Sequence, residues 1–434
     1  MPFNLFKYSS YTPLYLSVAY LIGTLMLFYF GPIKYAVADP VSFNLYLFFY
    51  LIMCCLGYMY GVKKANFFTG ITKEKLNKVN FWAFAVIALI SALILNMNYA
   101  KLPSLYPSNL INGLSGAINI FDIGYNYYDK HARAESYSGN KVLNIINFFL
   151  AWSRVVFLAY IIFEWKSLST LRRIISMIIV FIPVLSSLLV GTNKPIFDFI
   201  FIVIICVWLL IIRGSVTSKQ ILRPSLMARA MVVLLLSSFI VMFSQSMASR
   251  GATADLIEYT SGKREITVEM EGDTAPEAFY LIGTHYLVQG YYGFGLALDE
   301  SFDSTYGFGH SKFLLRQAAL FDEDIADRTY QSKISDNWHA DRQWHTAYAE
   351  FANDVHFIGV GFVMWVLFFW MAVTWKLGAG YGFREALYFV PLHAILVIFL
   401  PANNQVFGFL DTLSAYVFLS LAICIRAKVS FRKG

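Results

Sequence analysis

Residues 12–30, TPLYLSVAYLIGTLMLFYF, form an apolar run without a charged side chain. A helix of about 20 apolar residues crosses the hydrocarbon core of a bilayer, which is about 30 Å thick. The run is too long for the apolar part of a cleavable signal peptide, and no small-residue cleavage site follows it, so we expect an anchored helix. Similar runs recur along the chain, near residues 42–62, 81–97, 142–163, 174–191, 195–213, 230–247, 355–375, 385–400 and 406–424. The sequence therefore predicts an all-α polytopic membrane protein with about ten transmembrane helices.

The composition excludes an ordinary soluble protein. Hydrophobic residues make up 58% of the chain and charged residues 14%, whereas soluble domains carry about 25% charged residues. All four cysteines lie inside apolar runs. We expect them to be small buried apolar side chains rather than disulfides or metal ligands.

One long acidic segment, residues 248–354, interrupts the apolar runs. Between Arg250 and Asp354 it holds eight Lys or Arg and eighteen Asp or Glu, a net charge of −10, although the whole chain carries +7. Short basic loops stay in the cytoplasm, while long loops cross the membrane largely regardless of their charge. Every second connector between the predicted helices is basic, so we expect both termini in the cytoplasm and the acidic segment outside. The result is one integrated membrane domain, with helices 1–7 in residues 1–247, the outer loop in 248–354 and helices 8–10 in 355–434.

Within the outer loop, residues 275–298 (APEAFYLIGTHYLVQGYYGFGLAL) are apolar but are interrupted by His285, Gln289 and four glycines. Aromatic side chains favour the boundary between membrane and water. We therefore expect an interfacial or partly re-entrant helix here, followed by short helices in residues 299–344.

Charged residues inside the predicted spans need an explanation. Arg154 lies in the middle of one span, where a charge costs at least about 2.5–3.5 kcal/mol and therefore faces a partner or a polar cavity. Lys194 lies in a very short turn, four residues before Asp198. Both cations could bind an anionic lipid headgroup. The alternative is structural pairing, of Arg154 with Asp411 and of Lys194 with Asp198 on one helix face.

Three further cations stand out against the acidic loop. Arg250 directly follows a predicted span, and Arg316 and Arg342 lie deeper in the loop. The guanidinium group forms a fork that matches the oxygens of a phosphate. We expect these residues to bind a phosphate group, with salt bridges inside the loop as the alternative.

The stretch 337–348, NWHADRQWHTAY, concentrates histidine near the end of the loop. The unperturbed pKa of histidine lies near neutrality, which suits a general base. His339 and His345 are six residues apart and would not share one helix face, which disfavours a zinc-binding pair. A metal held by His285, His310, His339 and His345 together would lack any recognised ligand spacing, so we expect no metal.

Parts of the loop resemble a known family. Residues 345–361, from HTAYAE through two glycines into the next predicted span, are similar to the end of the outer loop in O-antigen polymerases and ligases. Residues 285–293 (HYLVQGYYG) and 306–311 (YGFGHS) are similar to the loop of Wzy-type repeat-unit polymerases. The turn around Lys194 resembles a turn in which that family carries arginine.

The resemblance implies a GT-C-type glycosyltransferase in a bacterial inner (plasma) membrane, with its large loop in the periplasm. Such an enzyme joins undecaprenyl-diphosphate-linked repeat units by transferring the donor glycan to the non-reducing end of the acceptor. Membrane lipids and a chain-length regulator protein are the expected partners, nucleic acid is not, and no cofactor is expected because cations serve the diphosphate. An O-antigen ligase, which transfers glycan to lipid A core, stays an alternative. A non-enzymatic transporter or flippase of lipid-linked glycan is a second alternative.

The resemblance and the residue chemistry together assign roles to the candidate residues. His345 is the expected catalytic base, with a structural hydrogen bond between loop and helix end as the alternative. The diphosphate-binding residues are expected to be Arg250, Lys194, Arg316, Arg342 and Arg154. The glycan-binding residues are expected to be Tyr286, Tyr291, Tyr292, His310, Trp338, Trp344 and His339. For the aromatic members of this set, anchoring at the membrane interface is the competing interpretation.

Overall fold

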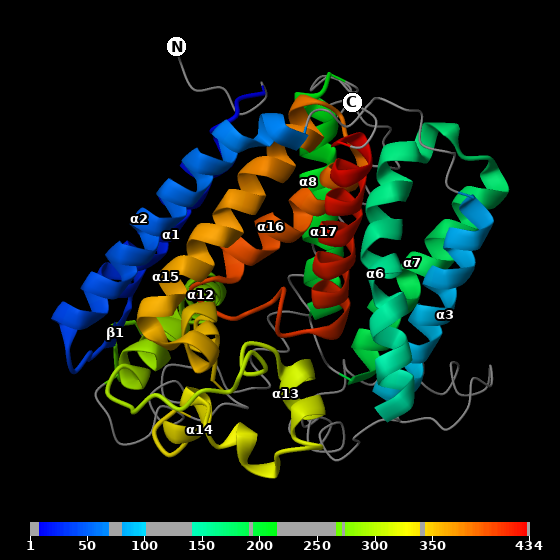
Figure 1. Ribbon diagram of the computed structural model, residues 1–434. Coiled ribbons are helices and arrows are strands. Elements are labelled where there is room, and N and C mark those ends of the chain that lie inside the picture. The colour runs from blue at the N-terminus through cyan, green and yellow to red at the C-terminus, as the bar shows by residue number, and fades with distance from the viewer. Residues whose placement is uncertain are drawn as a thin grey trace. The chain divides into compact units, whose positions relative to one another are not determined.

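The computed structural model describes residues 8–68, 80–100, 141–190, 194–214, 266–270, 274–338 and 343–431 of the chain (Figure 1). These residues are mostly helical. Five helical stretches among them are long and apolar enough to cross a membrane: Thr12–Phe30, Pro40–Phe68, Leu143–Ser167, Lys194–Ile212 and Ala347–Gly380. The chain is thus a mostly helical membrane protein, as predicted. The number of ten spans and the GT-C architecture stay predictions.

The described residues divide into two compact units, which we call the α6 unit and the α15 unit. The α6 unit contains α3 (Phe81–Ala100), α6 (Lys141–Glu164), η3 (Trp165–Ser167), α7 (Thr170–Val190), α8 (Lys194–Ile212) and α17 (Leu410–Phe431). The α15 unit contains α1 (Thr12–Phe30), β1 (Ile33–Tyr35), α2 (Pro40–Lys64), η1 (Ala65–Phe68), β2 (Ile266–Val268), α12 (Ala275–Ala297), α13 (Lys312–Ala318), η4 (Glu323–Ala326), α14 (Tyr330–Lys333), α15 (Ala347–Trp375), the π-helix η5 (Lys376–Gly380) and α16 (Arg384–Phe399). Each predicted apolar run coincides with a helix, except 230–247, which lies outside the described residues.

Polar side chains join the helices of the α6 unit. The hydroxyl of Ser414 on α17 accepts a hydrogen bond from the backbone N–H of Trp152 at 3.0 Å and donates one to the carbonyl of Phe148 at 2.5 Å. The hydroxyl of Ser91 on α3 donates to the side-chain oxygen of Asn147 on α6 at 2.9 Å. Hydrogen bonds of this kind supplement apolar packing between membrane helices.

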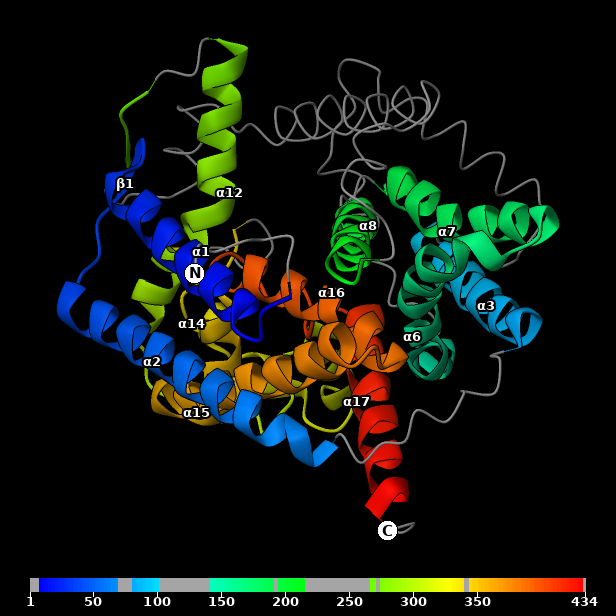
Figure 2. The same cartoon turned by 90° about the horizontal axis from the view of Figure 1, so that it is seen from above.

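In the α15 unit, α2 lies along α15, as both views show (Figure 2). Gly57 and Gly61 of α2 face α15 so closely that a Cβ atom would overlap the backbone carbonyl oxygens of Trp365 and Phe369. Small residues four apart on one helix face permit this close approach of two backbones. Figure 2 shows that α12 runs across the direction of the α2–α15 pair.

A kink divides α15 at His356, whose backbone angles are φ 60° and ψ 161°. This region of backbone space is nearly restricted to glycine and costs a residue with a side chain about 1–3 kcal/mol. Residues 357–375, beyond the kink, form a helix about 28 Å long at 1.5 Å per residue, enough to cross the hydrocarbon core. The segment 347–355, before the kink, is therefore not needed to cross the bilayer, and its polar residues can contact the loop.

The structure also contains a small sheet that the sequence did not predict. Strand β1 pairs antiparallel with β2, with Ile33 opposite Val268 and Tyr35 opposite Ile266. Each strand has three residues, which is too short for an alternating pattern to be recognised. The pairing ties the segment after α1 to the outer loop.

Helix α12 confirms the helix that we predicted for residues 275–298. A capping box starts it, because the Thr274 hydroxyl accepts a hydrogen bond from the Glu277 backbone N–H at 3.4 Å and the Glu277 carboxylate accepts one from the Thr274 backbone N–H at 3.2 Å. Pro276 at the start of the helix fits this position, since proline lacks a backbone N–H. The placement of α12 at the membrane surface stays a prediction.

Candidate functional site

The candidate site is built around residues 304–311, STYGFGHS, which we call the 304–311 loop. Tyr306 and Gly307 have φ angles of 55° and 89°, so the chain reverses direction tightly there. Gly309 lies against Thr305 and Asn353, where a Cβ atom would approach the Cβ atom of Asn353 to 2.6 Å. The glycines of the GFG sequence thus permit a compact loop to lie directly on α15.

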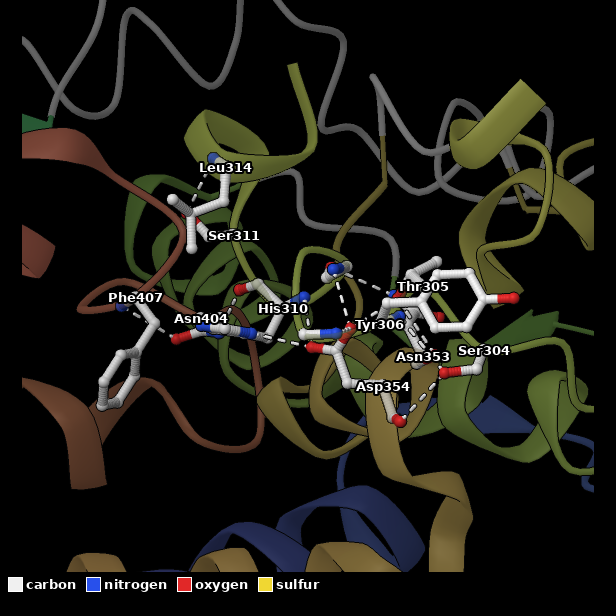
Figure 3. A network of polar contacts seen from close by, with 12 residues as sticks. Ser304, Thr305, Tyr306, His310, Ser311, Leu314, Asn353, Asp354, Asn404 and Phe407 are labelled. Atoms are coloured by element: carbon white, nitrogen blue, oxygen red, sulfur yellow. Dashed lines mark hydrogen bonds and ion pairs between the residues drawn. The ribbon is translucent and has the colours of Figure 1, made fainter. Parts of the chain in front are cut away.

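The carboxylate of Asp354 on α15 holds this loop (Figure 3). It accepts hydrogen bonds from the hydroxyl of Thr305 at 2.5 Å and from the backbone N–H groups of Gly307 and Gly309, both at 2.9 Å. It also accepts from the backbone N–H of His310 at 3.1 Å and from the Nδ1 atom of the same residue at 2.7 Å. A carboxylate with five donors is fixed in position, because each of its lone pairs has a partner.

The neighbouring Asn353 extends the same network. Its side-chain oxygen accepts from the backbone N–H of Tyr330 at 2.9 Å, and its amide group donates to the carbonyl of Gly309 at 3.2 Å and to Gln331 at 2.8 Å. Its backbone carbonyl accepts from the backbone N–H of Thr305 at 3.0 Å and lies 3.0 Å from the hydroxyl of Thr305, whose one hydrogen is shared with Asp354. Because of the kink at position 356, this carbonyl is free of the regular hydrogen-bond pattern of the helix. It can therefore accept hydrogen bonds from the 304–311 loop instead.

His310 is held on several sides. Its ring is stacked with Phe351 at a centroid distance of 5.9 Å and an angle of 24°, and it meets the edge of Phe407 at 6.0 Å and 72°. The amide of Asn404 donates a hydrogen bond to the backbone carbonyl of His310 at 2.8 Å. With Nδ1 bonded to Asp354, the orientation of the imidazole is fixed, while 21% of the side chain stays exposed. The sequence predicted His310 to contact glycan and gave no sign of its carboxylate partner.

Two cations on α13 lie beside this network. Ser311 caps the helix through a hydrogen bond from the backbone N–H of Leu314 to its hydroxyl. Lys312 and Arg316 lie four residues apart on this helix, so they share one helix face, and both are exposed. We call them the α13 cation pair. The charge of Lys312 acts on two buried groups, the imidazole of His345 and the carboxyl of Glu350.

The other basic side chains of the described outer loop already have partners. Arg328 forms an ion pair with Asp322 at 2.7 Å, and Lys333 donates a hydrogen bond to the carbonyl of Ser301 at 2.7 Å. Within the part of the chain that the structure describes, the α13 cation pair forms no ion pair. From the sequence, Arg316 was named as an expected diphosphate-binding residue, but Lys312 was not. The spacing of four residues between them, which places both on one helix face, could have identified Lys312.

His345 lies just before α15 and is almost completely buried, with 4% of its surface exposed. Gly293 of α12 makes room for it, because a Cβ atom at position 293 would lie 3.1 Å from Nδ1 of His345 and 2.8 Å from the indole nitrogen of Trp338. Neither ring nitrogen forms a hydrogen bond with any described residue. Burial, assisted by the charge of Lys312, lowers the pKa of His345 to about 3. The ring is therefore neutral at physiological pH, and it is also a weak base.

The predicted glycan-binding aromatic residues fall into two groups. Tyr291, Tyr292 and Trp338 are buried, and the rings of Tyr292 and Trp338 pack edge to face at 5.0 Å. Tyr286 and Trp344 are half-buried and lie against each other with a centroid distance of 3.9 Å. In this structure the second pair is the better placed to contact a glycan, and the first belongs to the core.

The intramembrane charges of the α6 unit form one network. Lys194 forms ion pairs with Asp198 on the same helix and, at 3.3 Å, with Asp411 on α17. A guanidinium nitrogen of Arg154 lies 3.9 Å from Asp411, and another donates to the carbonyl of Ser91 at 3.0 Å. The structure thus contains both pairings that we weighed as alternatives. Binding of diphosphate by Lys194 or Arg154 stays a prediction and would require this network to open.

Arg250, His339 and Arg342 lie outside the described residues, so their predicted roles stay predictions. Within the described ranges, no group of three or more His, Cys, Asp or Glu side chains is arranged to hold a metal ion.

Comparison with protein-family models, with curated proteins and with solved structures finds no match for this chain. The assignment of the candidate site therefore rests on the geometry of its residues alone. The resemblance to O-antigen polymerases stays a hypothesis drawn from the loop sequence.

Proposed function

We propose that this chain is a GT-C-type polymerase that joins undecaprenyl-diphosphate-linked repeat units at the periplasmic face of a bacterial inner membrane. It transfers the donor glycan to the non-reducing end of the acceptor and releases undecaprenyl diphosphate. The observation that carries the proposal is the α13 cation pair, which lies beside buried polar groups in a loop of net charge −10. The sequences of residues 285–311 and 345–361 support the same family.

The cation pair suits the leaving group of this reaction. Negative charge develops on the diphosphate as its bond to the sugar breaks, and cations placed in advance stabilise that charge. Arg316 offers a fork with two parallel donors, and Lys312 offers a compact point charge. In a loop whose net charge is strongly negative, an anion gains binding energy beside cations that, like the α13 pair among the described residues, form no ion pair with a carboxylate. These cations make a metal unnecessary in the proposed reaction.

The glycan has a matching surface in the half-buried Tyr286–Trp344 pair. Trp344 directly precedes His345, and its backbone N–H donates to the side-chain oxygen of Gln289 at 3.1 Å. Aromatic faces suit the apolar face of a sugar ring, and a fixed backbone holds them in place. The pair therefore fits a site in which sugars lie next to the diphosphate.

The deciding experiment uses the purified full-length protein in lipid nanodiscs. A synthetic undecaprenyl-diphosphate repeat unit is added in the presence of EDTA, and the products are separated by size. We expect a ladder of polymer. A lipid A core acceptor is supplied in a parallel reaction, and glycan attached to that core without a ladder would identify a ligase. If the wild-type protein makes neither product, with or without added Mg²⁺, the proposed function is wrong.

A transporter of lipid-linked glycan is the second candidate, and the charge network of the α6 unit favours it. Ionisable side chains inside membrane helices often mark the path of a substrate or an ion. Arg154, Lys194, Asp198 and Asp411 are such side chains. In sealed vesicles, a transporter would move the lipid-linked repeat unit across the bilayer without changing its mass, whereas a polymerase would change the mass and not the side.

A further inference from the structure

We propose that His310 is the catalytic base of this reaction and that Asp354 positions its ring. The inference rests on the proposed function, because it names the group that takes the proton of the acceptor hydroxyl. It moves this role away from His345, the residue that the sequence favours.

The hydrogen bond between the two side chains fixes the tautomer of His310. An ionised carboxylate only accepts hydrogen bonds, so Nδ1 of the ring carries the hydrogen in the 2.7 Å contact with Asp354. In the neutral ring the lone pair then lies on Nε2. This arrangement of carboxylate and imidazole is the one that orients the base of serine hydrolases and stabilises the imidazolium when it forms.

The carboxylate itself cannot turn away. Four further donors hold it, three of them backbone N–H groups of residues 307, 309 and 310. Phe351 and Phe407 confine the ring on two sides. Nε2 forms no hydrogen bond with any described residue, and the side chain is partly exposed. An acceptor hydroxyl would therefore approach the ring through the exposed 21% of the side chain.

His345 lacks each of these features. It is buried, its nitrogens have no partner among the described residues, and no carboxylate is bonded to it there. A proton placed on its ring would be a buried charge beside the cation Lys312. The α13 cation pair, in contrast, begins two residues after His310, so a base and two phosphate-binding cations lie within residues 310–316.

Nε2 of His310 takes the proton of the acceptor hydroxyl while that oxygen bonds to the anomeric carbon of the donor. The bond from this carbon to the diphosphate oxygen breaks, and its electron pair leaves with the diphosphate, beside Lys312 and Arg316. The imidazolium, stabilised by Asp354, later releases its proton to water.

The test compares two substitutions of His310 in the full-length protein. His310→Asn keeps a donor near the position of Nδ1 and can retain the contact with Asp354, but it removes the base. His310→Gln places an amide near the position of Nε2, where it can hydrogen-bond but cannot take a proton near neutral pH. We expect both variants to lose about 10²- to 10⁴-fold in kcat, while donor binding and the elution profile of the purified protein stay unchanged.

His285→Asn is the matched control, because the Nδ1 atom of His285 is also hydrogen-bonded, to the Tyr35 hydroxyl at 2.9 Å. We expect it to retain polymerisation. Imidazole added to a His310→Gly variant should restore part of the lost activity, which a purely structural role would not allow. Near wild-type kcat in His310→Asn or His310→Gln would overturn the inference while leaving the proposed function intact. Absence of polymer with the wild-type protein would instead overturn the proposed function.

Discussion

Gly290 of α12 lies so close to Pro401 that a Cβ atom at position 290 would overlap the carbonyl oxygen of Pro401. The same atom would lie 3.0 Å from the backbone nitrogen of Thr346, the residue that caps α15. The glycine of the QGYYG sequence thus lets α12 rest on the backbone where the loop enters the membrane helix.

This contact predicts opposite effects for two glycines of one helix. Gly290→Ala should lower the free energy of unfolding by about 1–3 kcal/mol, because the backbone must shift to admit a methyl group. Gly283→Ala should be neutral or stabilising by up to about 1 kcal/mol, since nothing lies within 4 Å of an added Cβ atom there. Thermal unfolding in detergent measures both. Equal melting temperatures for the two variants would contradict the close packing of α12.

The α13 cation pair should govern donor affinity. The double variant Lys312→Gln/Arg316→Gln should weaken binding of the lipid-linked donor about 10²- to 10⁴-fold, because it removes two cations and each hydrogen bond to a charged group contributes about 1.5–3 kcal/mol. Equilibrium binding of a short-chain prenyl-diphosphate glycan is the measurement. Arg328→Gln is the control, since its charge is already paired with Asp322. An equal loss in both proteins would mean that the overall charge of the loop, and not this pair, binds the donor.

The buried imidazole of His345 should make the fold sensitive to acid. Its pKa is about 3 in the folded protein and about 6.5 in an unfolded chain. The unfolded chain therefore binds one more proton between these values. We expect the free energy of unfolding to fall as the pH drops from about 6.5 toward about 3, by at most about 1.4 kcal/mol per pH unit. Above pH 6.5 the ring is neutral in both states, and this contribution is constant.

His345→Gln should remove that part of the pH dependence. Melting temperatures measured between pH 4 and pH 8 compare the variant with the wild-type protein. If both respond to acid alike, the ring is not buried in its neutral form.

The charge network of the α6 unit should be strongly coupled. Asp411→Asn should destabilise the protein by about 3–5 kcal/mol, because it leaves the buried cations Arg154 and Lys194 without their shared counter-ion. Adding Arg154→Gln to this variant should cost less than the sum of the two single changes, since one uncompensated charge is removed. Purely additive losses would show that Arg154 and Asp411 do not interact.

The topology can be tested at two exposed positions of the α15 unit. Leu320 is 45% exposed after α13, and Tyr381 is 51% exposed after η5. In a variant without its four native cysteines, Leu320→Cys should react with a membrane-impermeant maleimide added outside the cell. Tyr381→Cys should react only after the membrane is opened. Labelling of position 320 from the inside alone would reverse the orientation and remove the periplasmic site.

Hydropathy predicts the helices of this chain well and its site poorly, for a physical reason. An apolar run marks a helix locally, so the long helices of the described residues coincide with apolar runs in the sequence. The short elements β1, β2, α13 and α14 do not. The contacts of Asp354 join residues 44 to 49 positions apart, and no local pattern encodes them. The sequence also does not predict the kink at His356, because its backbone angles are typical of glycine and not of histidine. His345 was chosen as the base because of its neighbouring residues in the sequence. Those residues do not reveal that its side chain is buried.

The five hydrogen bonds that converge on Asp354 have a mechanical consequence. The 304–311 loop is fastened to the end of α15 on the loop side of the kink, without an intervening linker. If residues 347–355 tilted, His310 and the 304–311 loop would move with them as one rigid body. In the proposed reaction, the position of His310 would thereby be coupled to the orientation of α15, and we expect the rate to respond to bilayer thickness.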